Sequence, residues 1–237
     1  MAKFKNILIK ILTVIFVVFV IAAIFIFSNK YNNRKITDIQ VKVISPENRL
    51  MLLDTFLLEL LSDEIEELQG ANVKMLDYNH IINKLHKIEA IDTVNISCGV
   101  SGLLLIEVLQ KNPIARVYLS KSDIKYLTDK GGLIKSSYYG EELLVINGMV
   151  TGETNELVNF IENDKFLKAI TASILIDKNK NHILSTLYVD QPIYVGEINN
   201  LQEKSDNLRY FFEAIDDLEK YKELNLNYKN QIVAIKK

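Results

Sequence analysis

Residues that could carry chemistry are few in this chain of 237 residues, and their spacing fits no catalytic or metal site that we recognise. Cys98 is the single cysteine, so an internal disulfide and a zinc site built on cysteine pairs are both excluded. The alternating apolar run around Cys98 predicts a small buried side chain with an inert thiol rather than a nucleophile. The three histidines lie far apart and show no metal-ligand spacing; they are His80, His86 and His182.

Acidic residues gather in two clusters, and each cluster falls within a stretch of helical spacing. The clusters are Asp63, Glu64, Glu66 and Glu67, and Asp216, Asp217 and Glu219. Such patterns are typical of solvated helix faces. The Gly131-Gly132 pair indicates a turn, and the sequence contains no G-x-S-x-G, H-E-x-x-H, P-loop or G-x-G-x-x-G motif. We therefore predict no enzymatic activity, no cofactor and no metal.

The charge distribution argues against nucleic-acid binding. The first thirty-five residues carry six of the 28 Lys and Arg residues and no acidic residue. The remainder therefore has 22 basic and 30 acidic residues, a net charge of −8. A protein that binds phosphate backbones needs a basic surface, and this part of the chain is acidic.

One stretch near the N-terminus is long and apolar enough to span a bilayer. Ile11 to Phe27 has no charged residue, and we assign 7–27 as a transmembrane helix between a tail at 1–6 and a linker at 28–35. The rival reading is a cleaved signal peptide, but Phe25 to Phe27 before Ser28 is a poor cleavage context. Basic residues are balanced across the span, so the short tail is what favours a cytoplasmic N-terminus.

After the transmembrane helix, the sequence divides into two regions with different hydrophobic patterns. Region 36–112 alternates as a strand over 36–44, continues as two amphipathic helical stretches and ends as a β-hairpin over 91–110. The first helical stretch runs through Leu52 to Leu61, and Asp77 is a candidate cap for the second. This strand-helix-helix-strand-strand order predicts a small two-layer unit.

Region 113–237 begins where one strand-like run enters Pro113 and another leaves it, which suggests a domain boundary. The turn at 129–132 and mostly alternating patterns predict a β-rich domain with two helices, at 153–167 and around 208–218. The predicted strands are 115–119, 124–128, 133–135, 143–146, 170–176, 183–189, a strand through Tyr194 and Val195, and 224–235 with a bend at Lys229-Asn230. The expected fold class is thus α+β behind one transmembrane helix.

The order and spacing of these features resemble the FtsQ/DivIB cell-division family. Three segments carry the resemblance: Gln110-Lys111-Asn112-Pro113-Ile114-Ala115-Arg116-Val117, Tyr126-Leu127-Thr128-Asp129-Lys130-Gly131 and Leu224-Asn225-Leu226-Asn227-Tyr228. The resemblance implies a POTRA domain over 36–112 and an FtsQ-type β domain over 113–237. In the third segment the family has an arginine where this chain has Asn227, so an ion-pair role does not transfer to that position.

The resemblance also implies a non-enzymatic scaffold of the bacterial division machinery that links early and late division proteins. The implied partners are FtsB-like and FtsL-like single-span proteins together with other divisome proteins. The implied location is the inner membrane at the division septum, in a single-pass type II topology with periplasmic C-terminal domains. The alternative that the residues leave open is an anchored extracytoplasmic sensor or adhesion module.

The expected partner site rests on the physics of a sheet edge. Only Lys236 and Lys237 follow the predicted strand 224–235 in this sequence, so we expect its unpaired N–H and C=O groups to accept a strand from another chain. Tyr228 is the expected anchor, unless it packs inward and only stabilises its own domain. The predicted partner-binding residues are Leu224, Asn225, Leu226, Asn227, Tyr228, Lys229 and Ile232.

Overall fold

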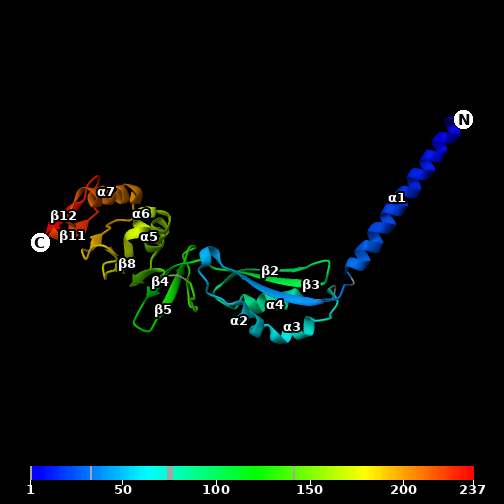
Figure 1. Ribbon diagram of the computed structural model, residues 1–237, viewed down its shortest axis with the longest axis horizontal. Coiled ribbons are helices and arrows are strands. Elements are labelled where there is room, and N and C mark those ends of the chain that lie inside the picture. The colour runs from blue at the N-terminus through cyan, green and yellow to red at the C-terminus, as the bar shows by residue number, and fades with distance from the viewer. Residues whose placement is uncertain (1, 33, 74–76, 141) are drawn as a thin grey trace. The chain divides into compact units, whose positions relative to one another are not determined.

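The computed structural model describes residues 2–32, 34–73, 77–140 and 142–237, and the chain divides into two compact units (Figure 1). The first unit comprises Met1–Ile44 and Leu53–Leu109, and the second comprises Ser45–Leu52 and Gln110–Lys237. The chain therefore passes between the units three times. The α+β prediction is confirmed, with an apolar helix, a small mixed sheet and a large mixed sheet.

The N-terminal helix α1 (Ala2–Asn32) contains one window, Ile11–Asn29, that is apolar and long enough to cross a membrane. None of this window is buried against the rest of the chain. Nineteen residues at about 1.5 Å each span roughly the hydrocarbon thickness of a bilayer. The helix thus has the features of a membrane anchor, which an N-terminal signal sequence would share.

A three-stranded sheet with the order β1-β3-β2 forms the first unit. Its strands are β1 (Asp38–Ile44), β2 (Ile91–Cys98) and β3 (Leu103–Gln110), and β1 runs parallel to β3. Alternate residues of β3 are fully buried, including Leu104, Ile106 and Val108, because three short helices cover that face (Figure 1). The helices are α2 (Asp54–Leu60), α3 (Ser62–Leu68) and α4 (Tyr78–Leu85).

Local signals in this unit were predicted well, with two exceptions. Asp77 caps α4 as expected, because its side chain accepts a hydrogen bond of 3.0 Å from the Asn79 N–H. The first predicted helical stretch, Leu52 to Leu61, corresponds to α2, but a further helix that was not predicted, α3, follows it after the non-helical backbone of Leu61. Cys98 lies at the end of β2 and is only partly buried, so the expectation of a buried cysteine is wrong.

The second unit is built on a nine-stranded mixed sheet with the order β12-β11-β10-β9-β8-β7-β4-β5-β6. The strands are β4 (Pro113–Tyr118), β5 (Ile124–Thr128), β6 (Leu133–Ile134), β7 (Leu144–Asn147), β8 (Thr171–Ile176), β9 (His182–Thr186), β10 (Ile193–Tyr194), β11 (Tyr221–Asn225) and β12 (Val233–Lys236). The pairs β4–β7, β7–β8 and β10–β11 are parallel, and the other neighbours are antiparallel. Pro113 starts a strand and the 129–132 segment turns β5 into β6, as expected.

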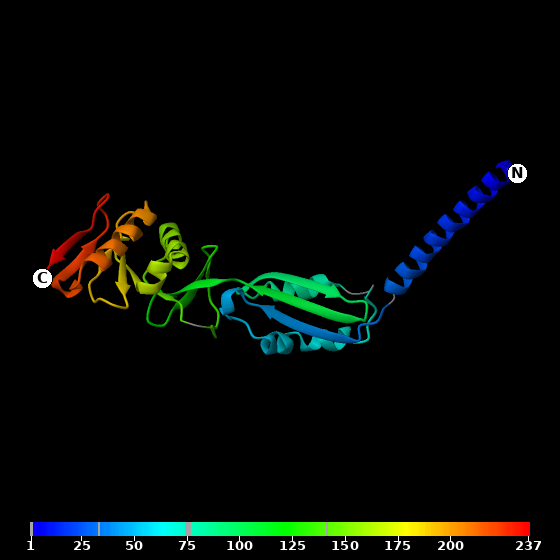
Figure 2. The ribbon, with the colours of Figure 1, turned by 45° about the horizontal axis from the view of Figure 1, so that its top comes forward.

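Helices α5 (Gly152–Asn163), α6 (Lys165–Ile170) and α7 (Leu201–Ala214) lie along one side of this sheet (Figure 2). They bury the inward side chains of the strands, among them Val117, Ile146 and Ile174. The single helix expected over 153–167 is wrong. Asp164 is extended and caps α6 by accepting a 2.8 Å hydrogen bond from the Leu167 N–H, so the chain restarts as a second helix.

Candidate partner-binding surface

The C-terminal segment forms a hairpin of two strands, so the prediction of one bent strand over 224–235 is wrong. β11 ends at Asn225 and β12 begins at Val233, and the two strands pair antiparallel. Asn230 adopts a positive φ of 56° in the turn between them. Asparagine tolerates this left-handed geometry better than most residues, so it reverses the chain instead of bending it.

The hairpin moves the free edge of the sheet from β11 to β12. β11 is flanked by β10 on one side and by β12 on the other, so the backbone at Leu224 and Asn225 is already paired. In the described part of the chain β12 has a strand on one side only and ends the sheet. The unpaired backbone groups therefore belong to Val233–Lys236, of which sequence reasoning named none as a site residue. The cluster of polar residues from Asn227 to Asn230 is the turn signal that could have located them.

The seven predicted residues occupy different environments. Leu224 is 2% exposed and Leu226 is 4% exposed, so both belong to the hydrophobic core of the second unit. Ile232 is partly buried against the same core. Asn225, the last residue of β11, is partly exposed, whereas Asn227 and Lys229 are exposed.

Tyr228 lies in the hairpin turn with 49% of its surface exposed. A tyrosine that mainly stabilised its own domain would be buried, so this exposure leaves the ring available to a binding partner. A large aromatic side chain on a well-supported turn is the type of residue that often dominates binding energy.

The turn that carries Tyr228 is held by the loop that follows β10. The Asn227 Oδ1 atom accepts a hydrogen bond of 3.3 Å from the Glu197 N–H. Gly196 makes this approach possible, because it has φ +72° and a Cβ atom there would lie 2.3 Å from the Asn227 Oδ1 atom. Asn227 thus has a structural role in this chain, through a short amide that an arginine could not reproduce.

Helix α7 supplies further support beside the same turn. The Glu203 carboxylate accepts a 2.7 Å hydrogen bond from the Asn230 N–H, and the Lys204 Nζ donates to the Val195 carbonyl at 2.9 Å. Burial lowers the pKa of the Lys204 ammonium, while Glu197 and Glu203 oppose that shift. The side chains of Glu197, Glu203 and Lys204 border a hollow of about 230 Å³ whose lining includes Tyr228. Hydrogen bonds from two neighbouring elements therefore support the turn, and a turn that is ordered before binding loses less entropy on binding.

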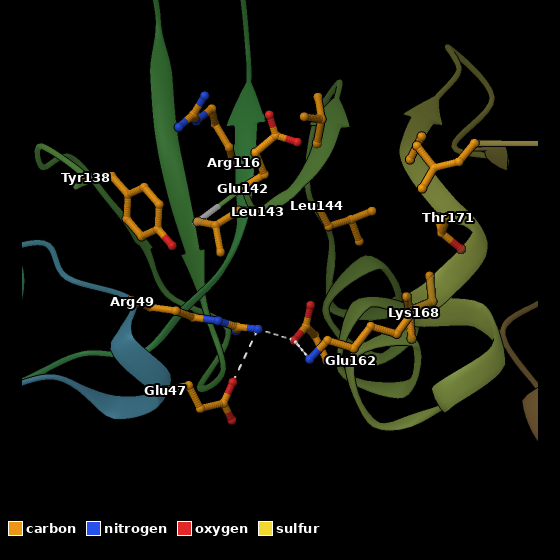
Figure 3. Close-up of a pocket in the computed structure, with 14 residues that line it drawn as sticks. Glu47, Arg49, Arg116, Tyr138, Glu142, Leu143, Leu144, Glu162, Lys168 and Thr171 are labelled. Atoms are coloured by element: carbon orange, nitrogen blue, oxygen red, sulfur yellow. Dashed lines mark hydrogen bonds and ion pairs between the residues drawn. The ribbon is translucent and has the colours of Figure 1, made fainter. Parts of the chain in front are cut away.

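A second, larger hollow in this unit has a volume of about 580 Å³ and is lined by three acidic and three basic side chains (Figure 3). Arg49 and Lys168 approach the Glu162 carboxylate from opposite sides, and Arg49 also pairs with Glu47 at 3.3 Å. The Lys168 Nζ lies 3.1 Å from the Glu162 Oε2 atom. The charges drawn together here neutralise one another, so we assign the cluster a structural role.

The segment Ser45–Leu52, called the strap here, lies between β1 and α2 in the sequence but belongs to the second unit. Arg49 of the charged cluster and the buried Gln110 hold it there. Gln110 is 1% exposed, and its Oε1 atom accepts hydrogen bonds from the N–H groups of Met51 and Leu52 at 2.9 and 3.2 Å. Its Nε2 atom donates to the Arg49 carbonyl. The Arg49 guanidinium donates to the Pro113 carbonyl at 3.1 Å. A single buried amide therefore satisfies three backbone groups of the strap.

Across 2–32, 34–73, 77–140 and 142–237, no group of three or more His, Cys, Asp and Glu side chains is placed to hold a metal ion. His182 is buried, and its Nε2 atom lies 2.9 Å from the Thr154 hydroxyl oxygen at the start of α5. Desolvation lowers the pKa of this imidazole, and Glu153 and Asp177 oppose the shift. Its contact is structural.

A family model described as FtsQ/DivIB, C-terminal related, matches residues 112–235, just over half of the chain. The match begins one residue before β4 and ends within β12, so it contains the C-terminal hairpin. No curated protein matches the chain. The model describes a family related to the FtsQ/DivIB C-terminal domain, which is less specific than the FtsQ/DivIB membership expected from the sequence. It assigns no family to the first unit.

Proposed function

We propose, since the chain belongs to the FtsQ/DivIB C-terminal related family, that it is a non-enzymatic, membrane-anchored scaffold of the bacterial division machinery. In this proposal α1 spans the inner membrane with its N-terminus in the cytoplasm, and both units lie in the periplasm. The protein links early and late division proteins at the septum and recruits FtsB-like and FtsL-like single-span partners. The family match across residues 112–235 is the observation that carries the proposal.

The free edge of β12 is the proposed docking point for a partner strand. A strand added there gains backbone hydrogen bonds that do not depend on side-chain identity. β12 is only four residues long, contains Lys236 and lies beside an irregularity in its pairing with β11 between Tyr221 and Glu223. Short length, lysine and bulges discourage unspecific edge pairing, so a cognate partner needs additional side-chain contacts. We expect the exposed Tyr228 to supply one.

Copurification from the native membrane tests the proposal. We expect small single-span division proteins to copurify with the tagged full chain, and Tyr228→Ala to weaken their capture by about tenfold or more, the effect typical of an interface aromatic. The matched control is Tyr188→Ala, because Tyr188 is 70% exposed but lies in the loop between β9 and β10. Equal capture by both variants would rule out Tyr228 as an anchor, and capture of no division protein would count against the scaffold itself.

A truncation that tests the sheet edge must leave the core residues of the second unit in place. A chain that ends at Glu223 loses Leu224 and Leu226, which are almost completely buried, so it would unfold and lose capture together. A chain that ends at Ile232 removes β12 while leaving both leucines and Ile232 in place. We expect this shorter deletion to lose capture while the second unit stays folded, as checked by near-UV circular dichroism.

A further inference from the structure

The turn Gly99–Gly102, between β2 and β3, presents an apolar side chain to solvent. Val100 is 83% exposed, more than any other described large hydrophobic side chain. One exposed valine is common on protein surfaces and needs no explanation by itself. Its position in the fold is what distinguishes it.

This turn lies at the end of the first sheet where the chain enters from α1. β1 runs parallel to β3 with Asp38 opposite Leu103, so both strands start at the same end. The Thr37 N–H donates to the Gly102 carbonyl at 3.0 Å, and the Thr37 hydroxyl donates to the Ser101 carbonyl at 3.2 Å. The turn and the segment that leaves α1 therefore touch directly.

The contact is close enough to require a glycine. Gly102 has φ +90°, and a Cβ atom there would lie 2.5 Å from the Lys35 carbonyl oxygen. The Arg34 guanidinium also donates to the Gly99 carbonyl. The backbone of Thr37 and the side chain of Arg34 thus hold the incoming segment against both ends of the turn, at Gly102 and Gly99.

The incoming segment is held on its other side as well. The Val73 N–H donates to the Arg34 carbonyl at 2.9 Å, and the Ile36 N–H donates to the Ala71 carbonyl at 2.9 Å. Ile36 is 1% exposed. From Arg34 onward the chain is therefore part of the folded unit, and α1 itself continues to Asn32.

Covalent geometry places this end of the unit near the apolar helix. From Asn29, where the apolar window ends, to Arg34 the chain covers three helical steps and two further residues, at most about 12 Å. The polar headgroup layer on each side of a bilayer is several Å thick. The turn held by Arg34 is thus within reach of the lipid surface that α1 would enter.

We propose that the turn Gly99–Gly102 is a lipid-contact surface, with Val100 entering the interfacial layer of the bilayer and the exposed Lys35 facing lipid phosphates. The inference rests on the proposed role of α1 as a membrane anchor. Tethering by α1 keeps the turn at high local concentration near the membrane, so a weak contact suffices. Apolar tips combined with lysines are a recurrent pattern at anionic membrane surfaces.

The absence of tryptophan from the chain allows a direct test. Single-tryptophan variants of the full chain are reconstituted in vesicles of phosphatidylcholine and phosphatidylglycerol with bromine on the acyl chains, which quenches nearby indole fluorescence. Val100→Trp is the test variant, and Ile44→Trp is the matched control, because Ile44 is 40% exposed at the opposite end of β1. Phe19→Trp, within the apolar window of α1, reports insertion of the anchor.

We expect strong quenching of Phe19→Trp, clear quenching of Val100→Trp and none of Ile44→Trp. Adding Lys35→Glu should reduce quenching at position 100 in anionic vesicles. If Phe19→Trp is quenched while Val100→Trp behaves like Ile44→Trp, the turn does not contact lipid although the anchor stands. If Phe19→Trp is not quenched, the proposed role of α1 as a membrane anchor is wrong.

Because tryptophan itself favours membrane interfaces, a hydrogen-exchange comparison on the chain with native Val100 is added. Slower exchange of residues 99–102 in vesicles than in detergent supports the proposal, and equal exchange overturns it.

Discussion

Replacing Gln110 by leucine should detach the strap Ser45–Leu52 from the second unit. Gln110 is 1% exposed and makes hydrogen bonds to backbone groups of Arg49, Met51 and Leu52. Leucine has a similar size but leaves these three groups without their partner. Each unsatisfied buried group costs about 1–3 kcal/mol, and because the strap can shift towards water we expect a total loss of about 2–4 kcal/mol.

Hydrogen exchange measured by mass spectrometry on the full chain is the appropriate assay, because two units need not unfold in one step. A loss of 2–4 kcal/mol corresponds to about 30-fold to 700-fold faster exchange of the strap amides. Gln40→Leu is the control, since Gln40 is exposed on β1 and its replacement should change stability by less than about 0.5 kcal/mol. If Gln110→Leu leaves exchange of the strap at the control rate, the hydrogen bonds of Gln110 do not hold the strap.

Two further predictions concern the second unit. Because burial lowers the pKa of His182 below its ordinary value of 6.5, the unfolded chain binds more protons than the folded one, so stability should fall as the pH drops below about 6.5. Urea titrations at a series of pH values should show a flatter pH dependence for His182→Gln than for the exposed His80→Gln, and identical slopes would contradict the assignment. Gly196→Ala should destabilise the hairpin turn by about 1–3 kcal/mol, since it combines strain at positive φ with overlap on Asn227. Thermal unfolding should show no comparable loss for Gly152→Ala, whose added Cβ atom would meet no atom within 4 Å, and equal effects would argue against a close approach at Gly196.

The parts of the fold that were predictable depend on local patterns. The apolar run of α1, the alternation of β1, the cap at Asp77 and the strand start at Pro113 each follow from a few neighbouring residues. The break at Asp164 was also encoded locally, because aspartate is a preferred N-cap, but the continuous apolar spacing suggested one helix.

The strap and the free edge could not be derived in the same way. The strap depends on Gln110, which lies 59 residues from Met51 in the sequence, and nothing in residues 45–52 indicates that partner. For the edge, a sequence pattern shows that a strand exists but not which strand ends the sheet. The turn at Asn230 divided the last predicted strand, and sheet order then placed β11 in the interior and β12 at the edge. Tyr228 remains a predicted anchor, now with its exposure known.

Site-specific photocrosslinking at the free edge tests the proposed scaffold function most directly. A benzophenone amino acid is placed at Ile235, which is 45% exposed on β12, and in a control at Tyr139, which is 56% exposed in the loop between β6 and β7. After irradiation of dividing cells, we predict a crosslink from position 235 to a small FtsB-like single-span protein and none to it from position 139. If the chain is inserted and folded but position 235 gives no such crosslink, or both positions give the same one, the β12 edge is not where this protein recruits its partner.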